Sequence, residues 1–288
     1  MSTTTAPAGA TAGTVVASRG LWARLQLEVV PLYMRSIRNT LRVPVTFIPS
    51  LVMPVMFLII NTSQLGDNVS FAPPAGVDLP AGPAGGGIDY IAFFIPVSLA
   101  MTIASAGNSS GLALVQDIAS GFFDKLMIAP ISRTSILVSR LMVDGTRAMI
   151  QAAIIVAVGL VMGASVAGGF AAILLTLVMA FLFGTAFAGL SLSIALKTGS
   201  PEATQGSFML FFPMVFLAPT FVPMEALPGW LQAIARVNPL TYVIEGLRSL
   251  FIVGIDWGEY FQGMLAVGVV GAVSLTMAFR ALKVRATA

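Results

Sequence analysis

The polar side chains that could do chemistry in this chain gather in two short runs. The first lies within residues 116–133 and reads QDIASGFFDKLMIAPISR, so that Asp124 and Lys125 stand beside Phe122, Phe123 and Leu126. Charged groups next to an apolar stripe of helical spacing are typical of a docking surface rather than of a catalytic centre. The same stripe would suit a short helix packed on a membrane surface, and spacing alone does not separate the two interpretations.

The second run lies within residues 224–248 and contains Glu245 and Arg248 among apolar neighbours. Residues three apart share a helix face, so we expect these two side chains to form an ion pair. An unpaired charge in apolar surroundings is costly, which leaves a structural ion pair and a contact with a transported substrate as the two interpretations.

Catalytic chemistry has few candidates elsewhere in the chain. The sequence holds no cysteine and no histidine, which removes thiol chemistry, the usual zinc sites and the common general base. It also lacks the Gly-x-x-x-x-Gly-Lys-Ser/Thr loop that cradles nucleotide phosphates. We therefore expect no catalytic residue, no metal site and no cofactor bound by this chain, and no nucleic-acid partner.

The composition of the chain is that of a membrane protein. Of its 288 residues 57% are hydrophobic and only 9% are charged, whereas a soluble domain has about 25% charged residues. The apolar residues form blocks of roughly 20, the length that crosses a bilayer as a helix. We predict an all-α membrane protein with six transmembrane helices, at about 43–63, 90–112, 148–165, 170–196, 207–223 and 260–279.

Two regions precede the first predicted span. Residues 1–18 consist of small and polar residues without periodicity, and we predict a disordered tail. Residues 19–42 alternate apolar and basic side chains at helical spacing, which predicts an amphipathic helix in the headgroup region, kinked at Pro31. A solvated basic lead-in is the alternative interpretation of this segment. In either case, we predict that the transmembrane domain occupies 43–288.

The basic residues predict the orientation. Thirteen of the 15 lie in 19–42, in 113–147, at Lys197 or after the last span, whereas the loop at 64–89 has none. Because basic residues remain on the cytoplasmic side, both termini and the loop at 113–147 should be cytoplasmic. The chain would then be a multi-pass protein of the cell membrane.

Local signals predict several breaks within this frame. Gly121 can end a helix and Pro130 can break the next, after which Ser132 or Thr134 could cap the third span's helix. The polar stretch at 107–111 favours a break in the second span, or a part of the translocation path. Residues 224–259 are too apolar for a water-exposed loop, so Pro239 should divide a helical hairpin that re-enters the membrane.

Two motifs in this six-span frame resemble those of the type-2 ABC exporter permeases, most of all the daunorubicin-resistance type. The first is the loop Asp117…Gly121…Asp124-Lys125-Leu126…Pro130-Ile131-Ser132-Arg133 after the second span. The second is Pro228-Gly229-Trp230-Leu231…Asn238-Pro239…Glu245-Gly246-Leu247-Arg248 before the last span.

The resemblance implies the membrane subunit of an ATP-driven exporter for hydrophobic drugs or lipid-like substrates. Two copies of an ABC ATPase subunit, carrying ATP and Mg²⁺, would work with two permeases, either two copies of this chain or one copy and a paralogue. It implies that the ATPase-coupling residues are Asp117, Gly121, Phe122, Phe123, Asp124, Leu126, Pro130 and Arg133. It further implies an external gate hairpin with Trp230, Pro239, Tyr242, Glu245 and Arg248.

An ion-coupled secondary drug carrier is the main alternative. Such carriers need ionisable groups near the middle of the bilayer. The predicted spans one to four and the last span have none at their centres, which argues against a carrier.

Overall fold

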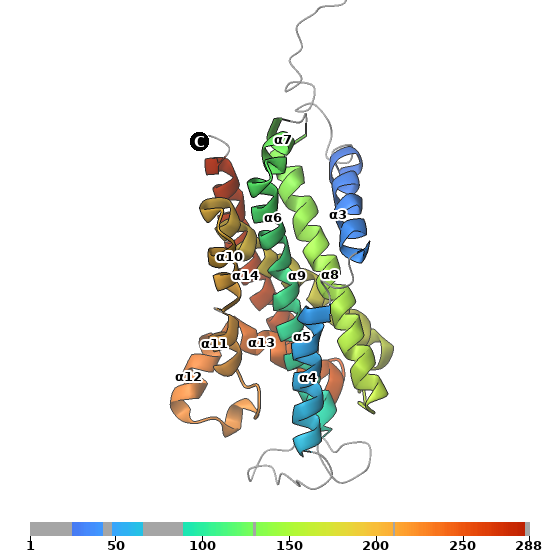
Figure 1. Cartoon of the computed structure of the whole chain (residues 1–288). Coiled ribbons are helices and arrows are strands. Elements are labelled where there is room, and N and C mark those ends of the chain that lie inside the picture. The colour runs from blue at the N-terminus through green and yellow to red at the C-terminus, as the bar shows by residue number, and fades with distance from the viewer. Residues whose placement is uncertain (1–24, 43–47, 66–88, 129–130, 210, 286–288) are drawn as a thin grey trace, which may run out of the picture.

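The computed structural model describes residues 25–42, 48–65, 89–128, 131–209 and 211–285, and every regular element in these ranges is a helix (Figure 1). The predicted all-α class is therefore confirmed for the described part of the chain. Four helical segments are long and apolar enough to cross a membrane, namely Tyr90–Ala119, Arg133–Val161, Gly169–Thr198 and Trp257–Arg285. They correspond to the predicted second, third, fourth and last spans.

The second span is divided as the polar stretch predicted. Helix α5 (Tyr90–Gly107) ends at Asn108, and α6 (Ser109–Ala119) continues in nearly the same direction (Figure 1). Asp89 caps the start of α5 by accepting a hydrogen bond from the Ala92 N–H at 2.9 Å. Its other carboxylate oxygen accepts from the Ser165 hydroxyl at 2.6 Å, so the same residue holds the turn after the third span.

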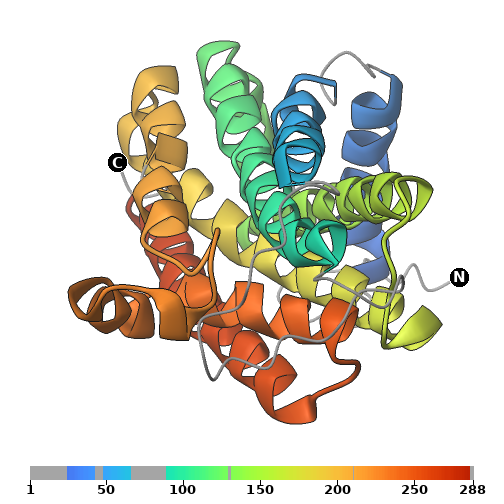
Figure 2. The ribbon, with the colours of Figure 1, turned by 90° about the horizontal axis from the view of Figure 1, so that it is seen from below.

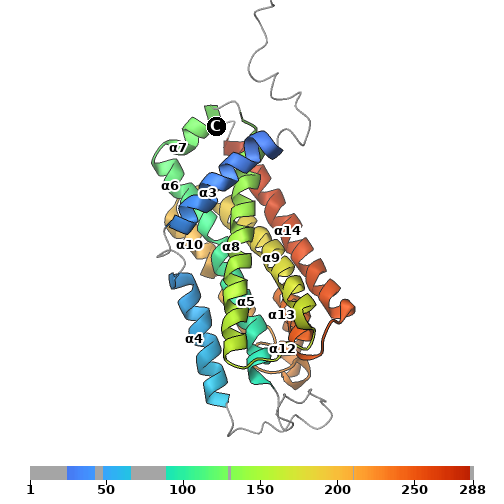
Figure 3. The ribbon, with the colours of Figure 1, turned by 90° about the vertical axis from the view of Figure 1, so that its right-hand side faces the viewer.

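Helix α9 (Gly169–Thr198) lies at the centre of the bundle. It packs against α14 (Trp257–Arg285), α8 (Arg133–Val161) and α5, and these helices run side by side in Figures 1 and 3. The main core forms where they meet, around fully buried side chains such as Ile95, Ile155 and Met179. Close packing of this kind fixes how one helix end sits relative to the next.

The first and fifth predicted spans are less regular. Helix α4 (Ile48–Leu65) contains Pro54 and packs along α5. Residues predicted as the fifth span form α10 (Pro201–Met209) and α11 (Phe211–Phe216), followed by turns rather than by helix up to Pro223. Residue 210, between these two helices, lies outside the described residues, and a total of six membrane crossings stays a prediction.

The N-terminal segment is helical where the structure describes it. A π-helical turn, η1 (Leu25–Val29), leads into α3 (Val30–Arg42), which lies along the outside of α8 (Figure 3). Val29 and Ile37 are buried against the bundle, whereas Arg35 and Arg38 are exposed, as expected for an amphipathic helix. The predicted tail at 1–18 and residues 19–24, 43–47 and 66–88 lie outside the described residues.

The predicted hairpin has the expected helix–break–helix form. After η3 (Met224–Ala226), α12 (Gly229–Val237) and α13 (Pro239–Ile252) meet at Asn238, whose backbone is extended. The Asn238 side chain accepts from the Leu240 N–H at 3.0 Å and donates to the Met214 carbonyl at 2.6 Å. The hairpin lies away from α3 and α7 (Figure 1), along one edge of the bundle with α12 projecting outward (Figure 2), and its re-entry into a membrane stays a prediction.

Candidate functional site

The candidate coupling helix is α7 (Phe122–Ile128), and a single residue sets its direction. Gly121 has a φ of 68°, the left-handed conformation that ends α6 and that a residue with a Cβ adopts only with strain. Its N–H donates to the Ile118 carbonyl at 3.1 Å, so the turn is closed within the end of α6. The chain therefore reverses at the tip of the bundle and presents α7 there (Figure 1).

The two aromatic residues of α7 have different surroundings. Phe123 is 3% exposed and packs in a cluster at this end of the bundle, with Leu137 of α8, Leu192 of α9 and Leu282 of α14. Phe122 is half-buried, and the guanidinium of Arg35 on α3 lies 4.4 Å from its ring centroid. Phe123 thus belongs to the chain's own core, while Phe122 joins α7 to α3 through a cation–π contact.

The outward face of α7 carries the groups that a partner could contact. Asp124 and Lys125 are exposed, and Ile128 is 86% exposed. Leu126 is half-buried and faces the bundle. A large apolar side chain between charged ones at the tip of a rigid bundle is suited to a protein contact.

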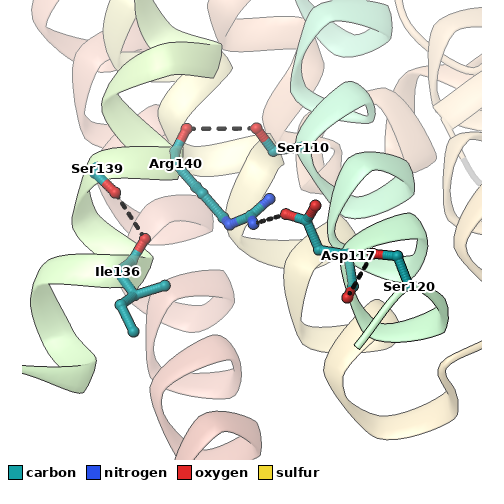
Figure 4. Close-up of polar contacts among 6 residues, drawn as sticks. All are labelled: Ser110, Asp117, Ser120, Ile136, Ser139 and Arg140. Atoms are coloured by element: carbon teal, nitrogen blue, oxygen red, sulfur yellow. Dashed lines mark hydrogen bonds and ion pairs between the residues drawn. The ribbon is translucent and has the colours of Figure 1, made fainter. Parts of the chain in front are cut away.

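An ion pair connects the helices on either side of α7. Arg140 of α8 donates to the carboxylate of Asp117 near the end of α6 (Figure 4). The Ser110 hydroxyl donates to the Arg140 carbonyl at 3.4 Å, a second contact between the same two helices (Figure 4). Because these contacts span the length of α6, that helix is held along α8 from its first turn to its last.

The N-terminal segment is attached to the start of α8. Ser132 caps this helix, because its hydroxyl accepts from the Ser135 N–H at 3.2 Å. Glu28, only 3% exposed, in turn accepts from the Ser132 N–H at 3.0 Å and from the Ser135 hydroxyl at 2.9 Å. A carboxylate beside the first N–H groups of a helix is favoured by the helix dipole, so Glu28 fixes η1 and α3 to α8.

The remaining predicted coupling residues lie at the same tip. Arg133 is the first residue of α8 and is exposed. Pro130 lies outside the described residues. The structure therefore brings Asp117, Gly121, Phe122, Phe123, Asp124, Leu126 and Arg133 together at one end of the bundle.

Sequence reasoning missed one charged residue behind this surface. Asp144 of α8 is 1% exposed and borders a polar cavity of about 210 Å³ enclosed by α3, α6, α7 and α8. Its carboxylate accepts from the N–H of Ser110 at 3.3 Å, in the first turn of α6. The sequence signal that could have identified Asp144 is its spacing from Arg147, because residues three apart share one helix face.

The predicted gate residues lie around the hairpin at the other end. Trp230 on α12 is 66% exposed, and Pro239 is the first residue of α13. The Tyr242 hydroxyl donates to the Arg236 carbonyl at 2.7 Å and so fastens α13 to α12. Glu245 and Arg248 are half-buried on α13.

The expected ion pair between Glu245 and Arg248 is wrong. The ion pair that the structure gives within its described residues is Arg140–Asp117. The guanidinium of Arg248 instead lies 3.8 Å from the ring centroid of Phe93 on α5 and donates to the Pro219 carbonyl at 2.9 Å. A flat cation can stack on an aromatic face while its edge donates, so Arg248 joins α13 to α5 rather than to its own neighbour.

Metal binding has no candidate among the described residues, where no three carboxylate side chains converge. Helix α7 and the hairpin lie toward opposite ends of one bundle (Figure 1). The arrangement provides a helix held by several contacts at one end and a helical hairpin at the other.

Comparison with known proteins gives a consistent match over most of the chain. The family described as ABC-2 type transporter matches residues 28–252. The chain is 26% identical over 208 residues to a daunorubicin resistance ABC transporter permease protein of Streptomyces coeruleorubidus, which covers 72% of this chain and 69% of that protein. It is 24% identical over 241 residues to a protein of Mycobacterium tuberculosis named as a probable doxorubicin resistance ABC transporter permease, covering 82% of each chain.

Proposed function

The chain belongs to the ABC-2 type transporter family, and on this premise we propose that it is the permease subunit of an ATP-driven exporter. Its substrate would be a hydrophobic drug or a lipid-like molecule that leaves across the cytoplasmic membrane. The names of the two similar permeases support a drug substrate. The four long apolar helices support a multi-pass membrane location.

The energy for transport would come from a separate subunit. This sequence has no phosphate-binding loop, so ATP and Mg²⁺ would bind to two copies of a partner ATPase. A second permease, identical or paralogous, would complete the membrane part. Both termini and α7 would face the cytoplasm, as the basic residues near the span ends predict.

The observation that carries this proposal is the way α7 is held. Its inner face is buried through Phe123, its flanking helices are joined by Asp117 and Arg140, and its side is joined to α3 by Phe122 and Arg35. The outer face, with Ile128, remains exposed. A partner that presses on this face would move α6, α8 and α3 together instead of bending a loose loop.

The hairpin at the other end would form the external gate. Its break at Asn238 and Pro239 and its exposed Trp230 support a covering element that is fixed at α13 and less restrained at α12. Arg248 would set its position through Phe93, in place of the ion pair expected from the sequence.

The buried Asp144 bears on the alternative of an ion-coupled carrier. It is an ionisable group inside a candidate span, which is what such a carrier needs. Its carboxylate, however, accepts from the N–H of Ser110 in the first turn of α6, which gives it a structural role as a helix cap. This contact favours the ATP-driven exporter.

The test is association of the purified permease with a candidate ABC ATPase subunit. We expect Ile128→Ser to weaken the complex about tenfold or more, because burying an isoleucine contributes about 1.5 kcal/mol or more. The matched control is Val161→Ser, since Val161 is 89% exposed at the far end of α8. Equal binding by both variants would exclude α7 as the coupling element. No ATPase bound to the unaltered chain, and no ATP hydrolysis stimulated by candidate drugs, would refute the proposed function itself.

A further inference from the structure

A basic groove opens at the α7 end of the bundle, between the last turns of α9 and α14. Its volume is about 650 Å³, and its lining residues are Leu196, Lys197, Arg280, Ala281, Val284 and Arg285. Half of them, the lysine and the two arginines, are cationic. Lys197 and Arg280 are exposed, and neither has an acidic partner among the described residues. Three positive charges that face one space, with no ion pair to an acidic side chain among the described residues, favour an anionic ligand.

One of the three cations is fixed in place. Arg285 donates to the Leu196 carbonyl at 2.8 Å, and its guanidinium lies 6.0 Å from the ring centroid of Phe123. The first contact ties α14 to the end of α9, and the second reaches α7. The groove is therefore a preformed feature of two packed helices and not a chance meeting of surface side chains.

A second cavity lies farther from the α7 end of the bundle and is apolar. Its volume is about 260 Å³, and it lies between α9, α11, α13 and α14, with Phe187, Leu190, Val273 and Met277 in its wall. The polar side chain in its lining is Ser274, whose hydroxyl already donates to the Ala186 carbonyl at 2.6 Å. The cavity thus offers contacts for a hydrocarbon chain and no unused hydrogen-bonding side chain.

The groove and the cavity lie on the same faces of the same two helices. Leu190 of the cavity and Lys197 of the groove are two helical turns apart on α9, a rise of about 10 Å. On α14, Met277 of the cavity is followed one turn later by Arg280 of the groove. The positive charges therefore stand one to two turns beyond the apolar cavity, toward the end of the bundle that carries α7.

We propose that this paired feature binds one anionic phospholipid of the surrounding leaflet. Its phosphate lies between Lys197, Arg280 and Arg285, and an acyl chain enters the apolar cavity. Both helices are candidate membrane spans that end at the groove, which is the depth at which a headgroup lies. A phospholipid satisfies both regions at once, whereas free phosphate would use only the groove.

The test measures lipid bound to the purified full chain in detergent micelles, by native mass spectrometry at low salt. Phosphatidylglycerol is compared with phosphatidylcholine, and inorganic phosphate is the competitor. We expect the variant Lys197→Gln/Arg280→Gln to bind phosphatidylglycerol about 30-fold more weakly, because each cation near a headgroup contributes about fivefold. Phosphatidylcholine binding should change little. Added salt should reduce the difference in phosphatidylglycerol affinity between the unaltered chain and the variant.

Two further variants separate the possible explanations. Lys125→Gln/Arg133→Gln removes the same charge from the same end, away from the groove, and should bind as the unaltered chain does. Val273→Phe narrows the apolar cavity and should weaken the binding of phosphatidylglycerol without altering the groove. If the paired variant is too unstable to purify, Arg280→Gln alone should give about a fivefold loss.

Three results would overturn the proposal. Unchanged phosphatidylglycerol binding in the groove variants would exclude the site. Displacement by inorganic phosphate together with no effect of Val273→Phe would assign the groove to free phosphate. Loss of ATPase binding with normal lipid binding would make the groove a protein contact. None of these measurements needs ATP hydrolysis or transport, so this proposal can fail while the proposed function stands.

Discussion

The ion pair between Asp117 and Arg140 should supply a measurable part of the contact that holds α7 in place. The side chain of Arg140 is 14% exposed and that of Asp117 is 31% exposed, so the pair lies between the surface and the interior. Exposed ion pairs contribute about 0.2–1 kcal/mol, whereas loss of one partner of a buried pair costs about 3–5 kcal/mol. We therefore expect an interaction free energy of about 1–2 kcal/mol.

A double-mutant cycle measures this value. Asp117→Asn and Arg140→Gln each remove a charge and leave a polar side chain, which is isosteric for asparagine and shorter for glutamine, and the double variant removes both charges. Asp117→Asn should lower the free energy of unfolding more, because it leaves the less exposed Arg140 without its counterion. The double variant should lose about 1–2 kcal/mol less than the sum of the two single losses.

The assay is unfolding of the purified chain in mixed micelles of a mild detergent and an anionic one. Asp124→Asn and Lys125→Gln form the control cycle, because both side chains are exposed and neighbours in sequence do not face each other on a helix. The control cycle should be additive. If the Asp117–Arg140 cycle is also additive to within about 0.3 kcal/mol, the pair does not hold α6 to α8 and the reasoning is refuted.

Three other predictions follow from single contacts. Gly111→Ala should destabilise the chain by about 1–3 kcal/mol, because the new Cβ would lie 2.0 Å from the Ser191 hydroxyl. The control Gly206→Ala has open space around the new Cβ and should not destabilise the chain. Equal melting temperatures of the two variants would contradict this packing. Arg248→Lys keeps the charge but cannot stack and donate at once, so it should impair export and detergent stability nearly as much as Arg248→Gln; full activity of the lysine variant would reduce the role of Arg248 to its charge alone. Because the chain has no cysteine, Thr134→Cys and Val161→Cys place single thiols at opposite ends of α8. An impermeant thiol reagent should label intact cells at position 161 only. Labelling at position 134 instead would reverse the predicted orientation.

The breaks in the helices could be predicted because their causes are local. Gly121 ends α6, Ser132 caps α8, and Pro239 begins α13 after an extended Asn238. Each signal depends on residues within about four positions, where backbone sterics and capping hydrogen bonds decide the outcome. The four long apolar helices were predictable for a similar reason, since length and hydropathy alone specify them.

The partners of individual side chains could not be predicted, because packing between distant segments decides them. Phe122 and Phe123 are adjacent, yet one contacts Arg35 and the other is buried among α8, α9 and α14. Arg248 had a suitable acid three residues away, but the Phe93 ring and a free carbonyl at Pro219 lie closer in the folded chain. These partners belong to other helices, and no periodicity encodes their approach.

The fifth span shows a limit of hydropathy. Residues 207–223 are apolar enough for a membrane helix, but the backbone leaves the helix after Phe216 and continues in turns up to Pro223. The hydroxyl of Ser207 donates to the Asn108 side chain at 3.1 Å, and the Thr220 hydroxyl donates to the Val215 carbonyl at 2.6 Å. Side chains that satisfy nearby polar groups allow the backbone to leave the helix, and an average of hydropathy does not contain that information.

The same polar residues explain why α5 and α6 are two helices and where movement between them would occur. The side chain of Asn108 does not cap α6, because its oxygen already accepts from the hydroxyls of Ser191 and Ser207 at 3.0 and 3.1 Å. Asp144, from α8, accepts from the first turn of α6 instead.

Helix α6 is thus fastened to α8 at its start by Asp144 and near its end by Asp117, while it is separated from α5 by the break. A partner that displaces α7 would therefore move α6 together with α8. The angle between α5 and α6 would change at Asn108, where side-chain hydrogen bonds stand in place of a continuous helix. The half of the second span that carries the core residue Ile95 would remain with the outer part of the bundle. In a coupling mechanism of this kind, the inner ends of the helices would move, while the contact between Phe93 and Arg248 would keep the hairpin attached to α5.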